Sequence, residues 1–189
     1  MLNSEFISHE SSLDLTGSES SRLRTAVRPE SLFITCTDSI MDQVIERIQR
    51  VPSILVLRSP GSEPPLETDG DDSSSSVIDH VLNQHSVRDI FVCGHSMCSS
   101  ASVEDRQTAH PKLSGVDRML QKIQHRQEMN ERSREQVIQQ MEKLARPPSV
   151  SRAISRGDLR VHGLFYLTES GTFTTYDELN SQFVLSSSP

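Results

Sequence analysis

The chain has 189 residues, a formal net charge of −7, 34% hydrophobic residues and 4% aromatic residues, which fits one domain of ordinary size. The acidic balance argues against nucleic acid or an anionic membrane as a partner, and no segment resembles a membrane-spanning helix or a secretory signal. The three cysteines, an odd number, fit reduced thiols better than a disulfide framework, so the expected location is the cytoplasm.

The domain boundaries follow from composition. Residues 1–28 are rich in Ser and Glu, and their isolated apolar residues show no sustained period, which predicts a disordered leader. The globular domain is expected over residues 29–180, and residues 181–189 are expected to form a tail.

The first half of the domain alternates strands and helices. Residues 32–36 form an apolar, β-branched run that predicts a strand, and apolar residues then recur at helical spacing over 41–48. A second buried strand is expected at 54–57. The acidic, Ser-rich stretch 59–76 predicts a long loop.

A short helix at 77–82 and a third strand at 89–93 continue this alternation. Helical spacing then predicts two helices, over 115–127 and 131–145. Alternating strands and helices indicate a parallel sheet, in which functional sites gather beyond the carboxyl ends of the strands.

The carboxyl-terminal part predicts a helix, a strand and a hairpin. A short helix is expected to end at Gly157, a residue suited to the left-handed conformation after a helix. Alternation over 159–167 predicts a strand, and a Gly-containing turn leads into a further strand at 173–176. The fold class is therefore α/β: one domain with a mainly parallel central sheet, flanking helices and a closing carboxyl-terminal hairpin.

Two turns that follow predicted strands carry the side chains that zinc prefers. Residues 36–38 read Cys-Thr-Asp, and residues 94–98 read Gly-His-Ser-Met-Cys. Thiolate and imidazole suit tetrahedral Zn²⁺, and three such ligands leave a fourth position to water or to a nearby carboxylate, here Asp38. The expected zinc ligands are Cys36, His95 and Cys98.

Three segments, in order and in register, resemble the β-class carbonic anhydrases. The family's Cys-x-Asp-x-Arg turn is matched by residues 36–40, except that Ile40 stands in the place of Arg. Its Gly-His-Ser-x-Cys-Gly turn is matched by residues 94–99, with Ser99 in the final position. Its carboxyl-terminal helix, His-Gly strand and hairpin resemble residues 156–171. The similarity spans the whole expected domain.

This resemblance implies one zinc ion per chain, held by the three ligands named above, and the reversible hydration of carbon dioxide to bicarbonate and a proton. In the family, the Arg of the first turn pairs with the Asp, keeps it off the metal and leaves it in a catalytic role, which falls here to Asp38. The resemblance also implies a homodimer or higher homo-oligomer, because the family's sheet extends across a subunit contact.

The residue at position 40 departs from the family in a way that bears on activity. An aliphatic side chain cannot make the two-pronged guanidinium–carboxylate bond, so we expect Asp38 to move onto the zinc as a fourth ligand and to reduce activity. Arg58 and Arg88 are candidates to replace the missing guanidinium, although the sequence does not place either one within reach. The family's Arg-Asn-x-x-Asn run also departs, reading Arg-Ser-Pro-Gly-Ser at 58–62.

Two functions therefore stay open. One is a carbonic anhydrase of reduced activity. The other is a catalytically silent, zinc-stabilised binding or regulatory module that uses the loop 59–76 as its contact surface. A fourth position open to water favours the enzyme, whereas an Asp38 oxygen at about 2.0 Å from zinc favours the module.

Three further residues have plainer interpretations. Cys93 is expected to be an apolar filler of a buried strand. His162 is expected to be a packed or hydrogen-bonded strand residue rather than a proton shuttle. Asp38 could in addition cap the helix that follows it.

Overall fold

The structure of the protein is a computed structural model that describes residues 28–51, 53–66, 77–101 and 114–185. Of the leader expected at 1–28, only residue 28 is described. Residues 67–76 of the expected loop 59–76 also lie outside the described residues. The strands of the described part are β1 Ser31–Thr35, β2 Ile54–Arg58, β3 Asp89–His95, β4 Arg160–Leu167, β5 Thr172–Asp177 and β6 Gln182–Leu185. The helices are α1 Asp42–Ile48, α2 Val77–Gln84, α3 Gly115–Ala145 and α4 Pro148–Ser155, with 3₁₀ turns at Ser39–Met41, Pro60–Ser62 and Ser99–Ala101.

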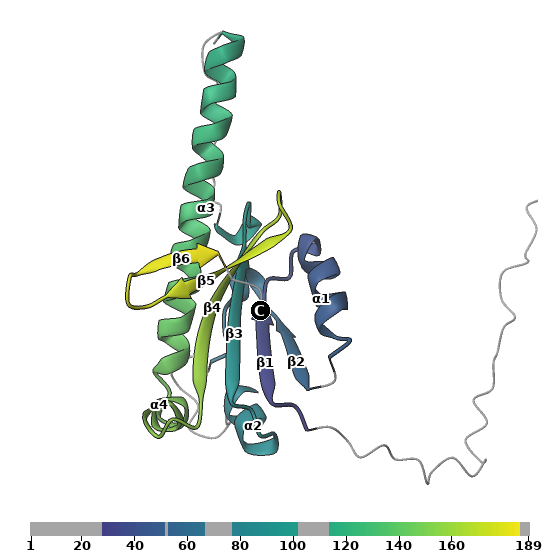
Figure 1. Cartoon of the computed structure of the whole chain (residues 1–189), viewed down its shortest axis with the longest axis vertical. Helices are drawn as coiled ribbons and strands as arrows, with labels where there is room; N and C mark the ends of the chain where they lie inside the picture. Colours follow the sequence, from purple (N-terminus) through teal and green to yellow (C-terminus); the bar gives the residue numbers. More distant parts are fainter. Residues whose placement is uncertain (1–27, 52, 67–76, 102–113, 186–189) are drawn as a thin grey trace, which may run out of the picture.

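The described strands form one sheet in the order β2-β1-β3-β4-β5-β6 (Figure 1). The first four are parallel, and β5 and β6 are added antiparallel. In this register β1 lies between β2 and β3, and Thr35 at its end pairs with both Arg58 and Cys93. The predicted α/β domain with a mainly parallel sheet and a closing hairpin is therefore confirmed.

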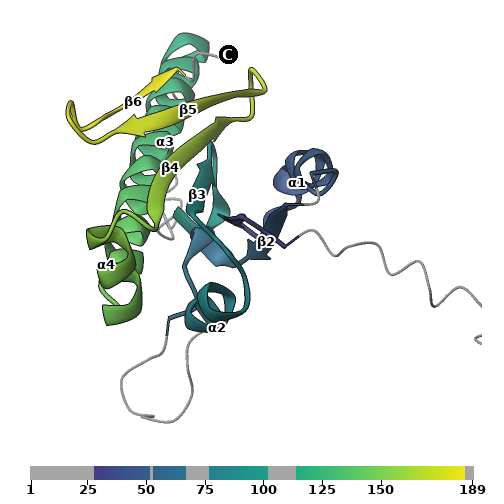
Figure 2. The same ribbon diagram turned by 60° about the horizontal axis from the view of Figure 1, so that its bottom comes forward.

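Both faces of the sheet are covered (Figure 2). Because side chains alternate along a strand, Leu32 and Ile34 of β1 enter a core shared with α2, α3 and α4, while Phe33 enters a second core shared with α1. Each core consists of buried, mainly apolar residues, and the central strand β1 is buried on both sides, as expected for a parallel strand.

Helix α3 is a single helix of 31 residues, so the prediction of two helices separated near residue 128 was wrong. The intervening polar residues include no Gly or Pro, and nothing in them interrupts the backbone hydrogen bonding. The first turns of α3 extend beyond the sheet (Figure 1), and their side chains are exposed. The second half of α3 is buried against β3 and β4, with Val137 and Leu144 in the core.

The domain also extends further than expected. The tail predicted to begin at 181 contains β6, which pairs with β5 at the edge of the sheet. Phe183 of β6 packs against the rings of Phe165 and Tyr176, at 5.9 Å and 5.3 Å between centroids. This aromatic contact stabilises the pairing of β6 with β5. The short, exposed sequence of β6 does not by itself predict this pairing.

Among the residues that the structure describes, no helix has the length and apolar character needed to cross a membrane.

Candidate metal centre

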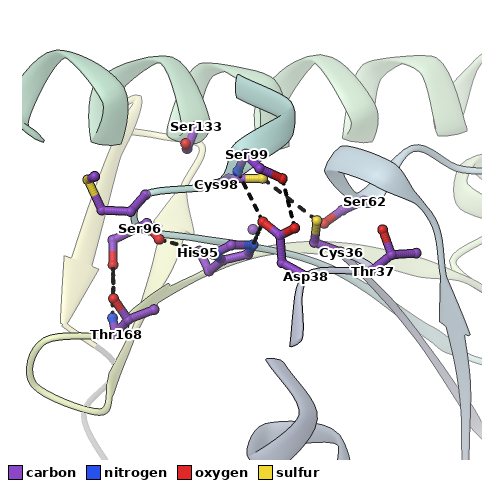
Figure 3. A network of polar contacts seen from close by, with 12 residues as sticks. Cys36, Thr37, Asp38, Ser62, His95, Ser96, Cys98, Ser99, Ser133 and Thr168 are labelled. Carbon is purple, nitrogen blue, oxygen red and sulfur yellow. Dashed lines mark hydrogen bonds and ion pairs between the residues drawn. The ribbon is translucent and has the colours of Figure 1, made fainter. Parts of the chain in front are cut away.

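Four side chains from two turns converge at the carboxyl ends of β1 and β3 (Figure 3). Cys36 directly follows β1, His95 is the last residue of β3, and Asp38 and Cys98 lie in the turns that come next. Their ligand atoms all lie within 4.8 Å of one another. The strands are neighbours in the sheet, so residues about 60 positions apart in sequence meet at one point.

The spacing of these atoms fits a tetrahedral zinc ion. Zn–S bonds of about 2.3 Å give a tetrahedron an S···S edge of about 3.8 Å, and Zn–N and Zn–O bonds of about 2.0–2.1 Å give an N···O edge of about 3.4 Å. The Sγ atoms of Cys36 and Cys98 are 3.7 Å apart. The Nε2 atom of His95 is 3.3 Å from Oδ2 of Asp38. These two edges match those of a zinc tetrahedron, and the remaining distances between donor atoms are no longer than 4.8 Å.

The imidazole of His95 is prepared for a metal. It is 1% exposed, and its Nδ1 atom lies 3.0 Å from the carbonyl oxygen of Ser96, to which Nδ1–H can donate. That bond leaves a lone pair on Nε2, which is buried and makes no hydrogen bond of good geometry. A buried nitrogen without a hydrogen-bond partner is costly unless something else binds it, and a metal ion does so.

The two thiols are close enough to share one proton. Contact with the Cys98 thiol lowers the pKa of Cys36, against the opposing effect of burial, and the neighbouring His95 imidazole acts in the same direction. The pKa of Cys98 is raised, because its thiol lies beside the Cys36 sulfur and is buried. The contact between the sulfurs therefore favours release of the first proton. A cation that binds both sulfurs favours loss of the second proton as well.

The carboxylate of Asp38 is held by Ser99. The backbone N–H of Ser99 donates to Oδ2 at 3.0 Å, and its hydroxyl donates to Oδ1 at 2.7 Å. Burial raises the pKa of the Asp38 carboxyl, but these hydrogen bonds outweigh it and lower the pKa below its usual range. Asp38 occupies the N-cap position of the 3₁₀ turn that follows it, but its side chain makes no capping hydrogen bond there.

Arg58 supports the backbone of the first turn and not the Asp38 carboxylate. Its guanidinium donates to the carbonyl oxygens of Cys36, Thr37 and Asp38 at 3.0–3.3 Å, and it forms an ion pair with Asp42 at 2.8 Å. Arg58 therefore lies close to the site, but it does not replace the missing Arg, because its guanidinium binds the backbone and Asp42. The other candidate, Arg88, directly precedes β3 and so lies at the opposite end of the sheet from the site.

The turn after β2 forms part of the floor of the site. Ser62 donates to the carbonyl oxygen of Cys93 at 2.7 Å, and Thr35 donates to the same oxygen at 3.1 Å. The backbone N–H of Gly61 contributes to the lowered pKa of Cys36. Gly61 has φ +62°, and a Cβ atom there would lie 2.1 Å from Gln136 Nε2, so this turn requires glycine.

Two residues behave as their plainer interpretations predict. Cys93 is fully buried in the core beneath α1, and burial raises the pKa of its thiol, so it is not part of the donor set. His162 lies away from the site, stacked on Phe91 at 4.8 Å and 2.8 Å from a carboxylate oxygen of Asp89. It is a packed, hydrogen-bonded strand residue.

Two contributors to the site are absent from the ligand set that the sequence predicts. Ser99 stands out in the sequence only as a departure from the glycine of the family's turn, and its hydrogen bonds to Asp38 depend on how the two turns meet. Arg58 is a candidate for pairing with the carboxylate, but its grip on three carbonyl oxygens has no signal in the sequence.

Comparison with known proteins finds similar sequences. A family model described as carbonic anhydrase matches residues 31–173. The chain is 27% identical to carbonic anhydrase 1 of Escherichia coli O157:H7 and 29% identical to a carbonic anhydrase of Pseudomonas aeruginosa, in each case over 86% of this chain and 80% of the relative.

Solved structures share the fold. The β-carbonic anhydrase CcaA superimposes with a TM-score of 0.61 at 22% identity, covering 84% of each chain. A tetrameric β-carbonic anhydrase from Sordaria macrospora gives a TM-score of 0.56 at 21% identity, covering 78% of this chain and 80% of the other.

Proposed function

The chain belongs to the carbonic anhydrase family, in its β class, and from this premise we propose that it binds one zinc ion and catalyses the reversible hydration of carbon dioxide to bicarbonate and a proton. The observation that carries the proposal is the spacing of the donor atoms. The S···S distance of 3.7 Å and the N···O distance of 3.3 Å are both within about 0.1 Å of the edges of a zinc tetrahedron.

Each residue of the site has a distinct role in this proposal. Cys36, His95 and Cys98 would hold the metal, which would lower the pKa of a bound water toward neutrality. Asp38 either accepts a hydrogen bond from the group at the fourth coordination position or occupies that position itself. Arg58 fixes the backbone of the first turn through three carbonyl oxygens, so that the donor atoms keep their spacing.

We propose further that the activity is low. Ile40 offers no guanidinium, and its side chain is 47% exposed. Asp38 Oδ2 lies 3.3 Å from His95 Nε2, beside the other donor atoms, and no arginine or lysine among the described residues pairs with it. The same observation favours a second candidate, a catalytically silent zinc-stabilised module, because a site with four protein ligands is structural rather than catalytic.

Stopped-flow measurement of proton release separates these functions. Zinc-loaded protein of verified metal content is mixed with dissolved carbon dioxide at neutral pH, and zinc-stripped protein is the control. We expect turnover well above the stripped control but far below that of a relative with the complete Asp–Arg pair. Turnover equal to that relative contradicts reduced activity. Turnover equal to the stripped control contradicts the enzyme and favours the silent module.

The proposal extends to assembly and location. We propose a homodimer or higher homo-oligomer, supported by the tetrameric relative from Sordaria macrospora, and a reducing compartment such as the cytoplasm, supported by the free cysteines at the site. Light scattering coupled to size-exclusion chromatography measures the assembly directly. A monomer at micromolar concentration contradicts the first part.

A further inference from the structure

The Asp38 carboxylate is gripped on both of its oxygens by one residue. The Ser99 hydroxyl donates to Oδ1 at 2.7 Å, and the Ser99 backbone N–H donates to Oδ2 at 3.0 Å (Figure 3). Hydrogen bonds to an ionised group are about twice as strong as those between neutral groups. To turn away from the metal position, Asp38 would have to break both.

These two bonds hold the carboxylate in the donor set rather than away from it. With Ser99 bound, Oδ2 lies 3.3 Å from His95 Nε2, and a carboxylate oxygen of Asp38 lies within 4.8 Å of both sulfurs. This position suits a fourth zinc ligand. We propose that Ser99 is a positioning residue that keeps Asp38 in the fourth coordination position and so closes the metal site. The inference rests on the proposed zinc site.

Opposing groups are missing or engaged. No lysine or arginine among the described residues lies within 4 Å of the Asp38 carboxylate. The Arg58 guanidinium is occupied by Asp42 and by the backbone of the first turn. Closure therefore has two causes: the absence of a competing guanidinium at position 40 and the presence of a hydroxyl at position 99.

A substitution can remove the hydrogen bond of the Ser99 hydroxyl and leave the hydrogen bond of its backbone N–H in place. Ser99→Ala deletes the bond to Oδ1 and leaves the backbone N–H that binds Oδ2. Ser99→Thr keeps a hydroxyl and should restore closure. Ser100→Ala is the matched control, because it removes the same group from the next residue of the same exposed 3₁₀ turn.

Azide binding to the cobalt-loaded protein reports whether the fourth position is available. Co²⁺ occupies tetrahedral thiolate sites, and its visible absorption changes when an anion replaces a ligand. We expect Ser99→Ala to bind azide at least roughly tenfold more tightly than the wild type, which corresponds to the loss of one hydrogen bond to a charged group. Ser99→Thr and Ser100→Ala should bind azide as the wild type does.

The outcomes separate the inference from the function on which it rests. Stoichiometric cobalt in every variant with equal azide affinity for wild type and Ser99→Ala overturns the role of Ser99 and leaves the zinc site standing. The same holds if Ser100→Ala has the effect expected of Ser99→Ala. Failure of the folded wild type, checked by circular dichroism, to take up stoichiometric cobalt or zinc overturns the proposed metal site and with it the inference.

Discussion

The sulfur atoms of Cys36 and Cys98 lie 3.7 Å apart although 62 positions separate the two residues in sequence. They form no disulfide. Parallel strands β1 and β3 are neighbours, so the turns at their carboxyl ends face each other and bring the two thiols to the spacing of a metal tetrahedron.

Replacing either sulfur should remove the metal. We expect Cys36→Ser and Cys98→Ser to be purified without stoichiometric zinc, because a serine hydroxyl is a much poorer zinc ligand than a thiolate. Cys93→Ala is the matched control, since Cys93 is a buried cysteine of the same region outside the donor set. Elemental analysis of the three variants measures the result. One zinc per chain in Cys36→Ser contradicts the assignment.

Restoring a guanidinium at position 40 should raise activity. Ile40 is 47% exposed, so an arginine can be accommodated there. We expect Ile40→Arg to increase the rate of carbon dioxide hydration about tenfold, and the double variant with Ser99→Ala to increase it further, because one change adds a competitor for Asp38 and the other removes a partner. Stopped-flow proton release measures both. Ile40→Lys tests whether charge alone suffices, and an unchanged rate in the double variant argues against Asp38 as the obstacle.

Weakening the grip of Arg58 should loosen the metal. Lysine keeps the charge but cannot donate to three carbonyl oxygens and a carboxylate at once. We expect Arg58→Lys to lower the zinc affinity roughly 10-fold, in the range found when groups that orient metal ligands are changed. Arg50→Lys is the control, since the Arg50 side chain pairs with Glu46 at an exposed position. Competition with a chromogenic chelator gives both affinities, and equal values contradict this role.

Stability at acid pH should depend on Asp89. Two hydrogen bonds from Arg160, at 2.8 and 2.9 Å, outweigh the effect of burial and lower the pKa of Asp89 below its usual range, and His162 adds to this shift. A carboxyl with a lowered pKa in the folded state stabilises the protein fully above its unfolded pKa of about 3.9, and this contribution is lost as the pH falls further.

We therefore expect Asp89→Asn to lower the melting temperature at pH 7 by roughly 2–4 °C, with a smaller difference from wild type below about pH 4. Melting curves by circular dichroism at several pH values measure this. Glu46→Gln, which changes an exposed surface pair, should show no comparable difference at either pH. A difference for Asp89→Asn that grows as the pH falls contradicts the assignment.

The packing of α3 on the sheet should tolerate no side chain at position 163. A Cβ atom on Gly163 would lie 2.5 Å from Met141 Sδ and 3.0 Å from Tyr176 Cβ. We expect Gly163→Ala to lower the free energy of unfolding by about 1–3 kcal/mol through overpacking. Gly115→Ala, at the start of α3 with no atom within 4 Å of the added methyl group, should be neutral or slightly stabilising. Urea denaturation compares them, and equal stability of the two variants contradicts the close contact.

The sequence by itself determined five of the strands and the α/β class, and it named the four side chains that the structure brings together. Successive strand residues alternate between the two cores, with Leu32 and Ile34 in one and Phe33 in the other, and cysteine and histidine at strand ends are the residue types that suit zinc. Sequence reasoning failed at β6, because Phe183 is held by an aromatic ring of another strand. It also failed in the middle of α3, because the helix continues there without an apolar spacing to mark it.

Only the tertiary structure decided which groups act on Asp38. Ser99 and Arg58 are ordinary polar residues in the sequence, and neither periodicity nor composition indicates which carbonyl or carboxylate each one binds. Their partners are set by the meeting of two turns from neighbouring strands, and hydrogen bonds of about 3 Å depend on this placement. The local sequence determines which side chains can donate a hydrogen bond. The packing of the whole sheet determines which acceptor each of them reaches.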